Sequence, residues 1–165
     1  MKQLCRAAVL VMFSAVPLKA QPAAPAYVPA FTCQQESLGI RLPRTYPMLR
    51  RIAPIRAETV GEVTNWGAYQ TVFRDLRFDG LHLQVVTFSN DPQRYMLAGA
   101  SITDPQWTPE GLLRIGQTLA ETRRRLSEFG VALSESLTIG GDGDAVTIRA
   151  TAGHIVELNY SCYTG

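Results

Sequence analysis

Hydrophobic and polar residues alternate over much of the chain after residue 58, and this pattern predicts a sheet of short strands. The expected strands cover 58–65, 69–78, 81–89, 95–103, 144–151 and 154–162. Asp79-Gly80 indicates a hairpin between the second and third of them, because both residues accept a positive φ. The segment 90–94 predicts a turn.

Apolar residues recur at helical spacing in one segment, 119–129. Leu119, Leu126 and Phe129 fall on one stripe, and Thr118 opens a capping box. Three prolines in the segment 41–58 leave room for only a short helix there. The predicted fold class is therefore α+β: an antiparallel sheet of five to seven strands packed against one main helix (119–129).

The first twenty residues are typical of a secretory signal. Lys2 and Arg6 precede the apolar run 7–16, which is too short to span a bilayer, and Ala20 suits the cleavage position. An uncleaved anchor is the alternative. The domain organisation that follows is a signal peptide at 1–20, a Pro/Ala-rich lead-in at 21–30 and a single domain at 31–165. We expect a periplasmic or secreted protein of the Gram-negative type.

Removal of the signal changes the charge. The formal charge of the whole chain is +2, and loss of Lys2, Arg6 and Lys19 brings it to −1. A chain without a global basic field is not expected to bind nucleic acid. Cys5 lies before the apolar run instead of at the cleavage site, so no lipid anchor is expected, and no other segment predicts a transmembrane helix.

Two cysteines, Cys33 and Cys162, lie near the two ends of the expected mature chain. In an oxidising compartment such a pair predicts one disulfide, which would close a loop around nearly the whole domain. A reactive cysteine or a metal-binding pair is the rival interpretation. The strand phase of the last hairpin points Cys162 inward with the core residues, as a structural disulfide requires.

The segment GGDGDAVTI, 140–148, is close to a calcium-binding nonapeptide repeat. The repeat requires aspartate at its sixth position, where this chain has Ala145, and only one copy is present. A hairpin loop accounts for every residue of the segment. We therefore predict no metal site and no cofactor.

Candidate binding residues gather in a proline-rich region and the turn after it. Arginine suits bidentate contacts to carboxylate or phosphate, and exposed aromatic residues often anchor interfaces. The alternative is a basic surface loop with core aromatics. The candidates are Arg41, Arg44, Arg50, Arg51, Arg56, Trp66 and Tyr69.

The segment RIGQTLAETRRRLSEFG resembles a helix of small outer-membrane assembly lipoproteins of the SmpA/OmlA type and of β-lactamase-inhibitor-protein-like domains. The matching residues are Ile115, Gly116, Thr118, Leu126 and Gly130. The likeness covers 115–160 and includes the hairpin after the helix. It implies an α+β binding scaffold without an active site.

No catalytic motif occurs in the chain, and the leading prediction is a non-enzymatic protein-binding module of the cell envelope, either assembly-related or inhibitor-like, with an envelope or periplasmic protein as its partner. One alternative is a binder of an anionic small molecule or polymer through Arg41–Arg56. A second is an enzyme of unrecognised class that uses Asp75, Asp79 or His82.

Overall fold

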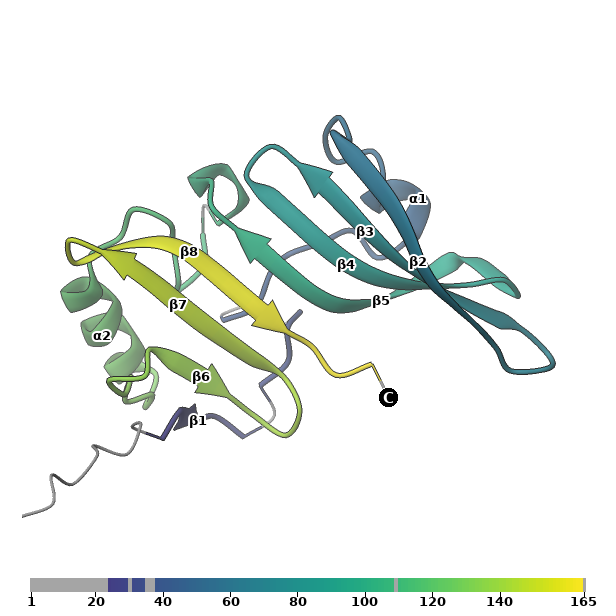
Figure 1. Cartoon of the computed structure of the whole chain (residues 1–165). Helices are drawn as coiled ribbons and strands as arrows, with labels where there is room; N and C mark the ends of the chain where they lie inside the picture. Colours follow the sequence, from purple (N-terminus) through teal and green to yellow (C-terminus); the bar gives the residue numbers. More distant parts are fainter. Residues whose placement is uncertain (1–23, 30, 35–37, 109, 165) are drawn as a thin grey trace, which may run out of the picture.

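The computed structural model describes residues 24–29, 31–34, 38–108 and 110–164, and their main feature is one eight-stranded sheet (Figure 1). The signal expected at 1–20 lies outside these residues. The strands are β1 (Ala26–Tyr27), β2 (Ala57–Asn65), β3 (Gln70–Phe78), β4 (Leu81–Phe88), β5 (Asp91–Ile102), β6 (Thr138–Gly140), β7 (Ala145–Thr151) and β8 (His154–Ser161). The helices are α1 (Tyr46–Leu49), α2 (Leu119–Glu128) and a short 3₁₀ turn, Pro105–Trp107.

The sheet has the order β1-β6-β7-β8-β5-β4-β3-β2 and is mixed. β1 runs parallel to β6, and every other neighbouring pair is antiparallel. Consecutive strands form two meanders, β2 to β5 and β6 to β8. The antiparallel pairing of β5 with β8 joins the two meanders into one sheet.

The predicted fold class was wrong: the structure is mostly sheet, with eight strands, one parallel pair and two short α-helices. Two strands escaped prediction because β1 and β6 have only two and three residues, too few to show an alternating pattern. β1 also lies within the Pro/Ala-rich lead-in. A helix of ten residues, α2, is too short to cover such a sheet alone.

Several local predictions are confirmed. Asp79-Gly80 connects β3 to β4, and Gly80 has a φ of +67°. Thr118 caps α2 by accepting a hydrogen bond from the Glu121 amide. The turn expected at 90–94 was misplaced, because the strand resumes at Asp91 and residues 92–94 form a bulge against β4. Pro92 is tolerated there because a bulge does not need every ladder N–H.

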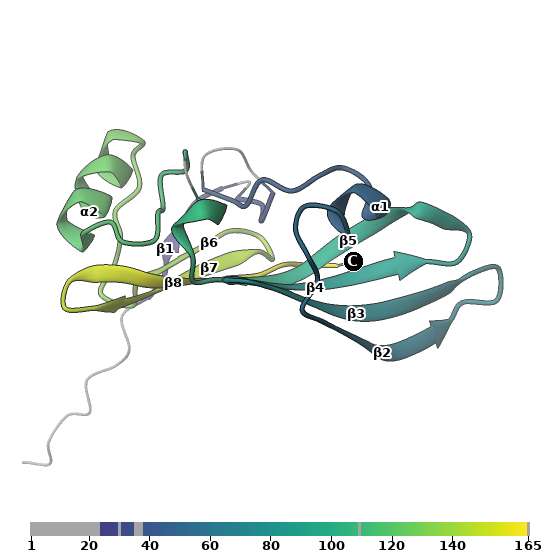
Figure 2. The ribbon, with the colours of Figure 1, turned by 90° about the horizontal axis from the view of Figure 1, so that it is seen from above.

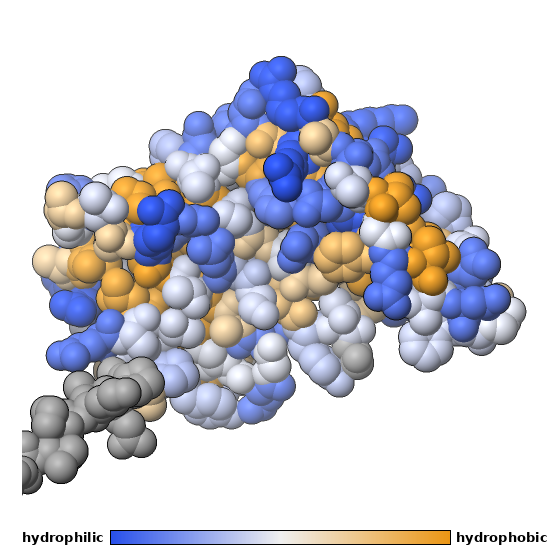
Figure 3. All heavy atoms as spheres, in the orientation of Figure 1, coloured by the Kyte–Doolittle hydropathy of each residue, from blue (hydrophilic) through white to orange (hydrophobic). Residues whose placement is uncertain are grey.

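One face of the sheet is covered and the other is not (Figure 2). α2 lies over the β6–β8 half, and α1 with the segment before it lies over the β3–β5 half. The alternate residues Leu81, Leu83 and Val85 of β4 are buried on the covered face. The uncovered face mixes hydrophilic and hydrophobic side chains (Figure 3). Burial therefore stabilises the fold mainly on one side of the sheet.

The predicted disulfide is present between Cys33 and Cys162, with Cα atoms 5.8 Å apart. It joins the segment that follows β1 to Cys162, the residue directly after β8. Asp144, in the glycine- and aspartate-rich segment 140–148, binds the backbone on both sides of the disulfide. Its carboxylate accepts hydrogen bonds of 2.6 Å from the backbone amides of Cys33 and Tyr163.

Within the described ranges, no helix is both long enough and apolar enough to cross a membrane.

Candidate functional site

The five candidate arginines do not form one basic surface. Three of them are paired with acidic side chains, two of which lie more than twenty positions away in sequence. The pairs are Arg41–Glu110 at 2.9 Å, Arg50–Glu58 at 2.7 Å and Arg56–Asp79. The described residues supply no ion-pair partner to Arg44 or Arg51.

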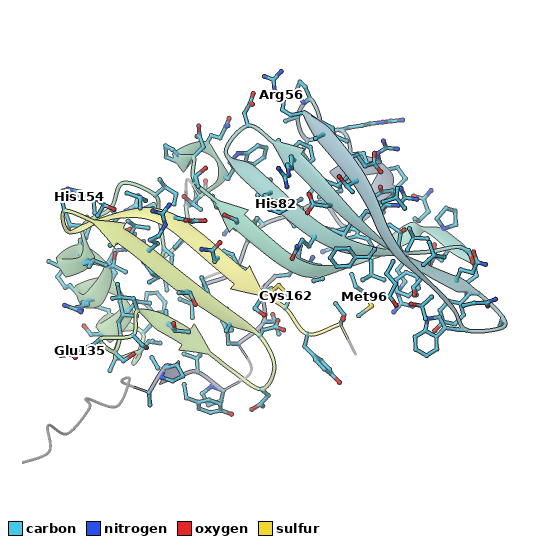
Figure 4. The ribbon with its side chains drawn as sticks, viewed as in Figure 1. Arg56, His82, Met96, Glu135, His154 and Cys162 are labelled. Atoms are coloured by element: carbon cyan, nitrogen blue, oxygen red, sulfur yellow. A yellow bond between two sulfur atoms is a disulfide. The ribbon has the colours of Figure 1, made fainter. Side chains whose placement is uncertain are left out.

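Arg56 is held at the start of β2 by the hairpin that follows β3. Hydrogen bonds and charge from Asp79 raise the pKa of Arg56, and the same hydrogen bonds hold the pKa of Asp79 below its usual value. Both side chains are more than half exposed, so this pair contributes little to stability. Figure 4 shows Arg56 at the opposite end of the β2–β5 meander from Met96.

Trp66 and Tyr69 lie at that other end, in the turn between β2 and β3. Their rings stack with centroids 6.5 Å apart, and the Tyr69 ring lies 6.1 Å from that of Phe88 on β4. Trp66 is 61 % exposed. The structure thus separates the two predicted aromatic residues from the arginines and places them beside an aromatic residue that was not singled out.

These rings line a groove of about 600 Å³, which we call the aromatic groove. The residues Val86 and Met96 add apolar surface to it from β4 and β5, and the guanidinium of Arg94 lies 4.6 Å from the centroid of the Phe88 ring. Val86 and Met96 are cross-strand partners. Val86 lies between Val85 and Thr87, which are buried on the covered face, so both partners and the groove lie on the uncovered face of the sheet. Its full lining is Trp66, Tyr69, Thr71, Val86, Phe88, Asn90, Arg94, Met96 and Thr164.

β5 borders this groove and has an unpaired edge. β5 is twelve residues long, yet β8 pairs only with its last four, Gly99–Ile102. Cys162 donates one further hydrogen bond to the carbonyl of Ala98 and then the chain turns away. Among the described strands, none pairs with this side of β5 before Gly99. We call the segment Gln93–Ala98 the free edge of β5.

A second pocket lies on the covered side of the free edge, and we call it the arginine pocket. Its volume is about 410 Å³, and it is lined by Gln34, Ile40, Arg41, Leu42, Pro43, Arg44 and Tyr95. The Tyr95 hydroxyl donates a 2.6 Å hydrogen bond to the carbonyl of Pro43, and burial raises the pKa of Tyr95 to about 12. Since Tyr95 and Met96 are adjacent in β5, they point to opposite faces, and the two pockets flank the same edge.

The disulfide lies close in sequence to both pockets. Cys33 precedes Gln34 in the arginine pocket, and Cys162 precedes Thr164 in the aromatic groove by two residues. Figure 4 places Cys162 and Met96 at the same margin of the sheet, where β8 ends beside β5. The bridge therefore lies within two residues of one lining residue of each pocket.

The residues considered for catalysis are only partly brought together. Asp75 on β3 and His82 on β4 lie diagonally across the two strands on the uncovered face, with a 2.6 Å contact between Oδ2 and Nε2. Asp79 is directed elsewhere, toward Arg56. Ser101 lies opposite His82 on β5, but its hydroxyl donates to Glu157 on β8. The Asp75–His82 pair is thus part of a row of polar side chains that crosses β3, β4, β5 and β8.

Sequence reasoning missed most of the residues at the two pockets, including Phe88, Arg94, Tyr95 and Met96. The only signal was in the segment 81–89, which contains Phe88 and has apolar residues on both faces of the strand. The chain matches no family model, no curated protein and no solved structure.

Proposed function

We propose that this is an exported, non-enzymatic protein-binding module that binds an extended segment of a partner protein by strand addition to the free edge of β5. The observation that carries the proposal is the register of β5 with β8, which leaves Gln93–Ala98 without a neighbouring strand. An open edge offers backbone N–H and C=O groups for pairing, and pockets on either side select alternate side chains.

The other long edge of the sheet is less suited to this role. β2 is interrupted by a bulge between Val60 and Val63, and Glu58 and Glu62 place charges along it. Bulges and charged side chains are the devices by which edge strands avoid pairing with other chains. No pocket described here is lined by the middle of β2.

The free edge of β5 also contains two bulges, at 92–94 and at Ala98, which limit regular pairing to Tyr95–Leu97. The added segment is therefore short, on the order of four to six residues, as in other modules that bind peptides at a sheet edge. Its side chains would alternate between the aromatic groove and the arginine pocket. These pockets, and not a long hydrogen-bonded ladder, would supply most of the selectivity.

Two further observations support export and binding. The Cys33–Cys162 disulfide suits an oxidising compartment such as the periplasm, in agreement with the signal-like first twenty residues. The uncovered sheet face carries an aromatic groove, and clustered aromatic residues at a concave surface commonly anchor protein interfaces.

The test begins with peptides selected from a random display library on the purified, oxidised protein. Each selected peptide is then resynthesised with single N-methyl groups along its backbone, which remove one N–H at a time. Strand addition predicts that methylation weakens binding at alternate residues only, because alternate N–H groups point toward the free edge. Selected peptides that bind equally well with methylation at every position would rule strand addition out.

A further inference from the structure

We infer that the partner segment alternates acidic residues with aromatic or large apolar residues, the acidic side chains entering the arginine pocket and the apolar ones the aromatic groove. This inference rests on the strand-addition function proposed above and specifies the chemistry of its partner.

The arginine pocket has the charge to select an acidic side chain. Arg41 and Arg44 both line it, and its described lining includes no acidic residue. Arg41 pairs with Glu110, but both side chains are largely exposed, at 63 % and 73 %, so the pair is weak and can exchange partners. An arginine fork binds a carboxylate in bidentate fashion, which favours aspartate or glutamate over a neutral side chain.

The aromatic groove selects the opposite chemistry. The stacked rings of Trp66 and Tyr69, the tilted ring of Phe88 and the side chain of Met96 supply its apolar surface. An aromatic side chain placed there buries its own surface and that of Trp66, which is otherwise 61 % exposed. Arg94 at the rim adds a third positive charge and again no acid lines the groove.

Alternation follows from strand geometry. Successive side chains of an added strand point to opposite faces of the sheet, so neighbouring residues of the partner face different pockets. An apolar residue at one position therefore requires an acidic residue at the next. A segment with the same composition in two blocks would place acids against the rings or apolar groups against the arginines.

Other occupants of the edge fit less well by charge. Residues 1–23 of this chain contain no acidic residue. A second copy docked edge to edge would bring together two margins that each carry Arg44 and Arg94, and like charges at an interface are unfavourable. A partner protein that carries the acidic residues is the occupant that the pockets favour.

The experiment uses three capped six-residue peptides with the purified, oxidised protein. One alternates aspartate with phenylalanine, the second alternates lysine with phenylalanine, and the third has the composition of the first in two blocks. Binding is measured at low and moderate ionic strength. We expect the alternating acidic peptide to bind roughly tenfold or more tightly than either control, with an advantage over the lysine peptide that shrinks as salt is added.

Protein variants locate the contacts. Arg44→Glu should weaken the acidic peptide and strengthen the lysine peptide, whereas Arg123→Glu, an exposed arginine on α2, should change neither. Trp66→Ser should weaken both peptides. Phe129→Ser is the matched control, because Phe129 is also 61 % exposed and lies at the end of α2, away from β5.

The outcomes separate this inference from the function beneath it. Equal binding of the acidic and lysine peptides, or of the alternating and block peptides, overturns the inferred chemistry, while alternate N-methyl sensitivity of library-selected peptides would still support strand addition. Acidic selectivity that is indifferent to N-methylation overturns strand addition itself. Failure of all three peptides, or a self-associated protein whose dimer occupies the edge in sedimentation experiments, overturns the inference.

Discussion

Removing the Cys33–Cys162 bridge should lower the free energy of unfolding substantially. The bridged residues are 129 positions apart, so the bond constrains almost the whole described chain in the unfolded state. The chain-entropy relation gives about 5 kcal/mol for a loop of this length, and measured losses in other proteins run from roughly 2 to 5 kcal/mol. Such a loss is a large part of the total stability of a domain, about 5–15 kcal/mol.

The assay is urea unfolding of the oxidised protein, of Cys33→Ala, of Cys162→Ala and of the double variant. Either single change breaks the bridge, so each should lose nearly as much as the double variant, and reduction of the unmodified protein should reproduce that loss. Losses that simply add between the two single variants would refute the reasoning, because they would mean that each cysteine acts through its own packing.

Two other predictions concern single residues, Gly80 and Glu157. Gly80→Ala should destabilise the protein more than Gly153→Ala does: both glycines have positive φ, which costs an alanine about 1–2 kcal/mol, but a Cβ at Gly80 would lie 2.2 Å from the Cβ of Asp104. Overpacking should add roughly 1–3 kcal/mol, measured by thermal or urea unfolding, and equal losses would contradict the turn geometry.

Hydrogen bonds from Ser101 and Arg149 hold the pKa of Glu157 below its usual value, so this carboxylate stabilises the fold above about pH 4.5 and loses that contribution as the pH falls through the lowered value. Glu157→Gln should therefore be less stable at neutral pH and lose less stability than the unmodified protein between neutral pH and about pH 3. Parallel losses in the two proteins would contradict this assignment.

Local features of the fold were readable from the sequence because their causes are local. Asp79-Gly80 specifies a tight hairpin through its backbone preferences, and Thr118 specifies the start of α2 through its side-chain cap. β1 was not readable, since two residues gain strand geometry only by pairing with β6, which is more than 100 residues away. The predicted number of strands was therefore too low, and the predicted fold class was wrong for the same reason.

The candidate site depends on long-range register, which explains why the sequence reveals so little of it. Arg94 and Met96 become notable only because β8 ends opposite Gly99 and leaves one edge of their strand unpaired. The arginines of the segment 41–56 looked like one basic cluster, but the fold supplies carboxylates to three of them and assigns Arg44 to a different surface from Trp66. The resemblance of 115–160 to lipoprotein and inhibitor-like domains stays a prediction.

The most direct test of the central claim is backbone amide hydrogen exchange, resolved by residue, with and without a library-selected peptide bound. Strand addition predicts new protection at alternate amides within Gln93–Ala98, because these N–H groups gain partners on the bound peptide. The β2 edge and α2 should keep their original exchange rates. Protection confined to Ala57–Asn65 or to α2, with the amides of Gln93–Ala98 unchanged, would contradict the account.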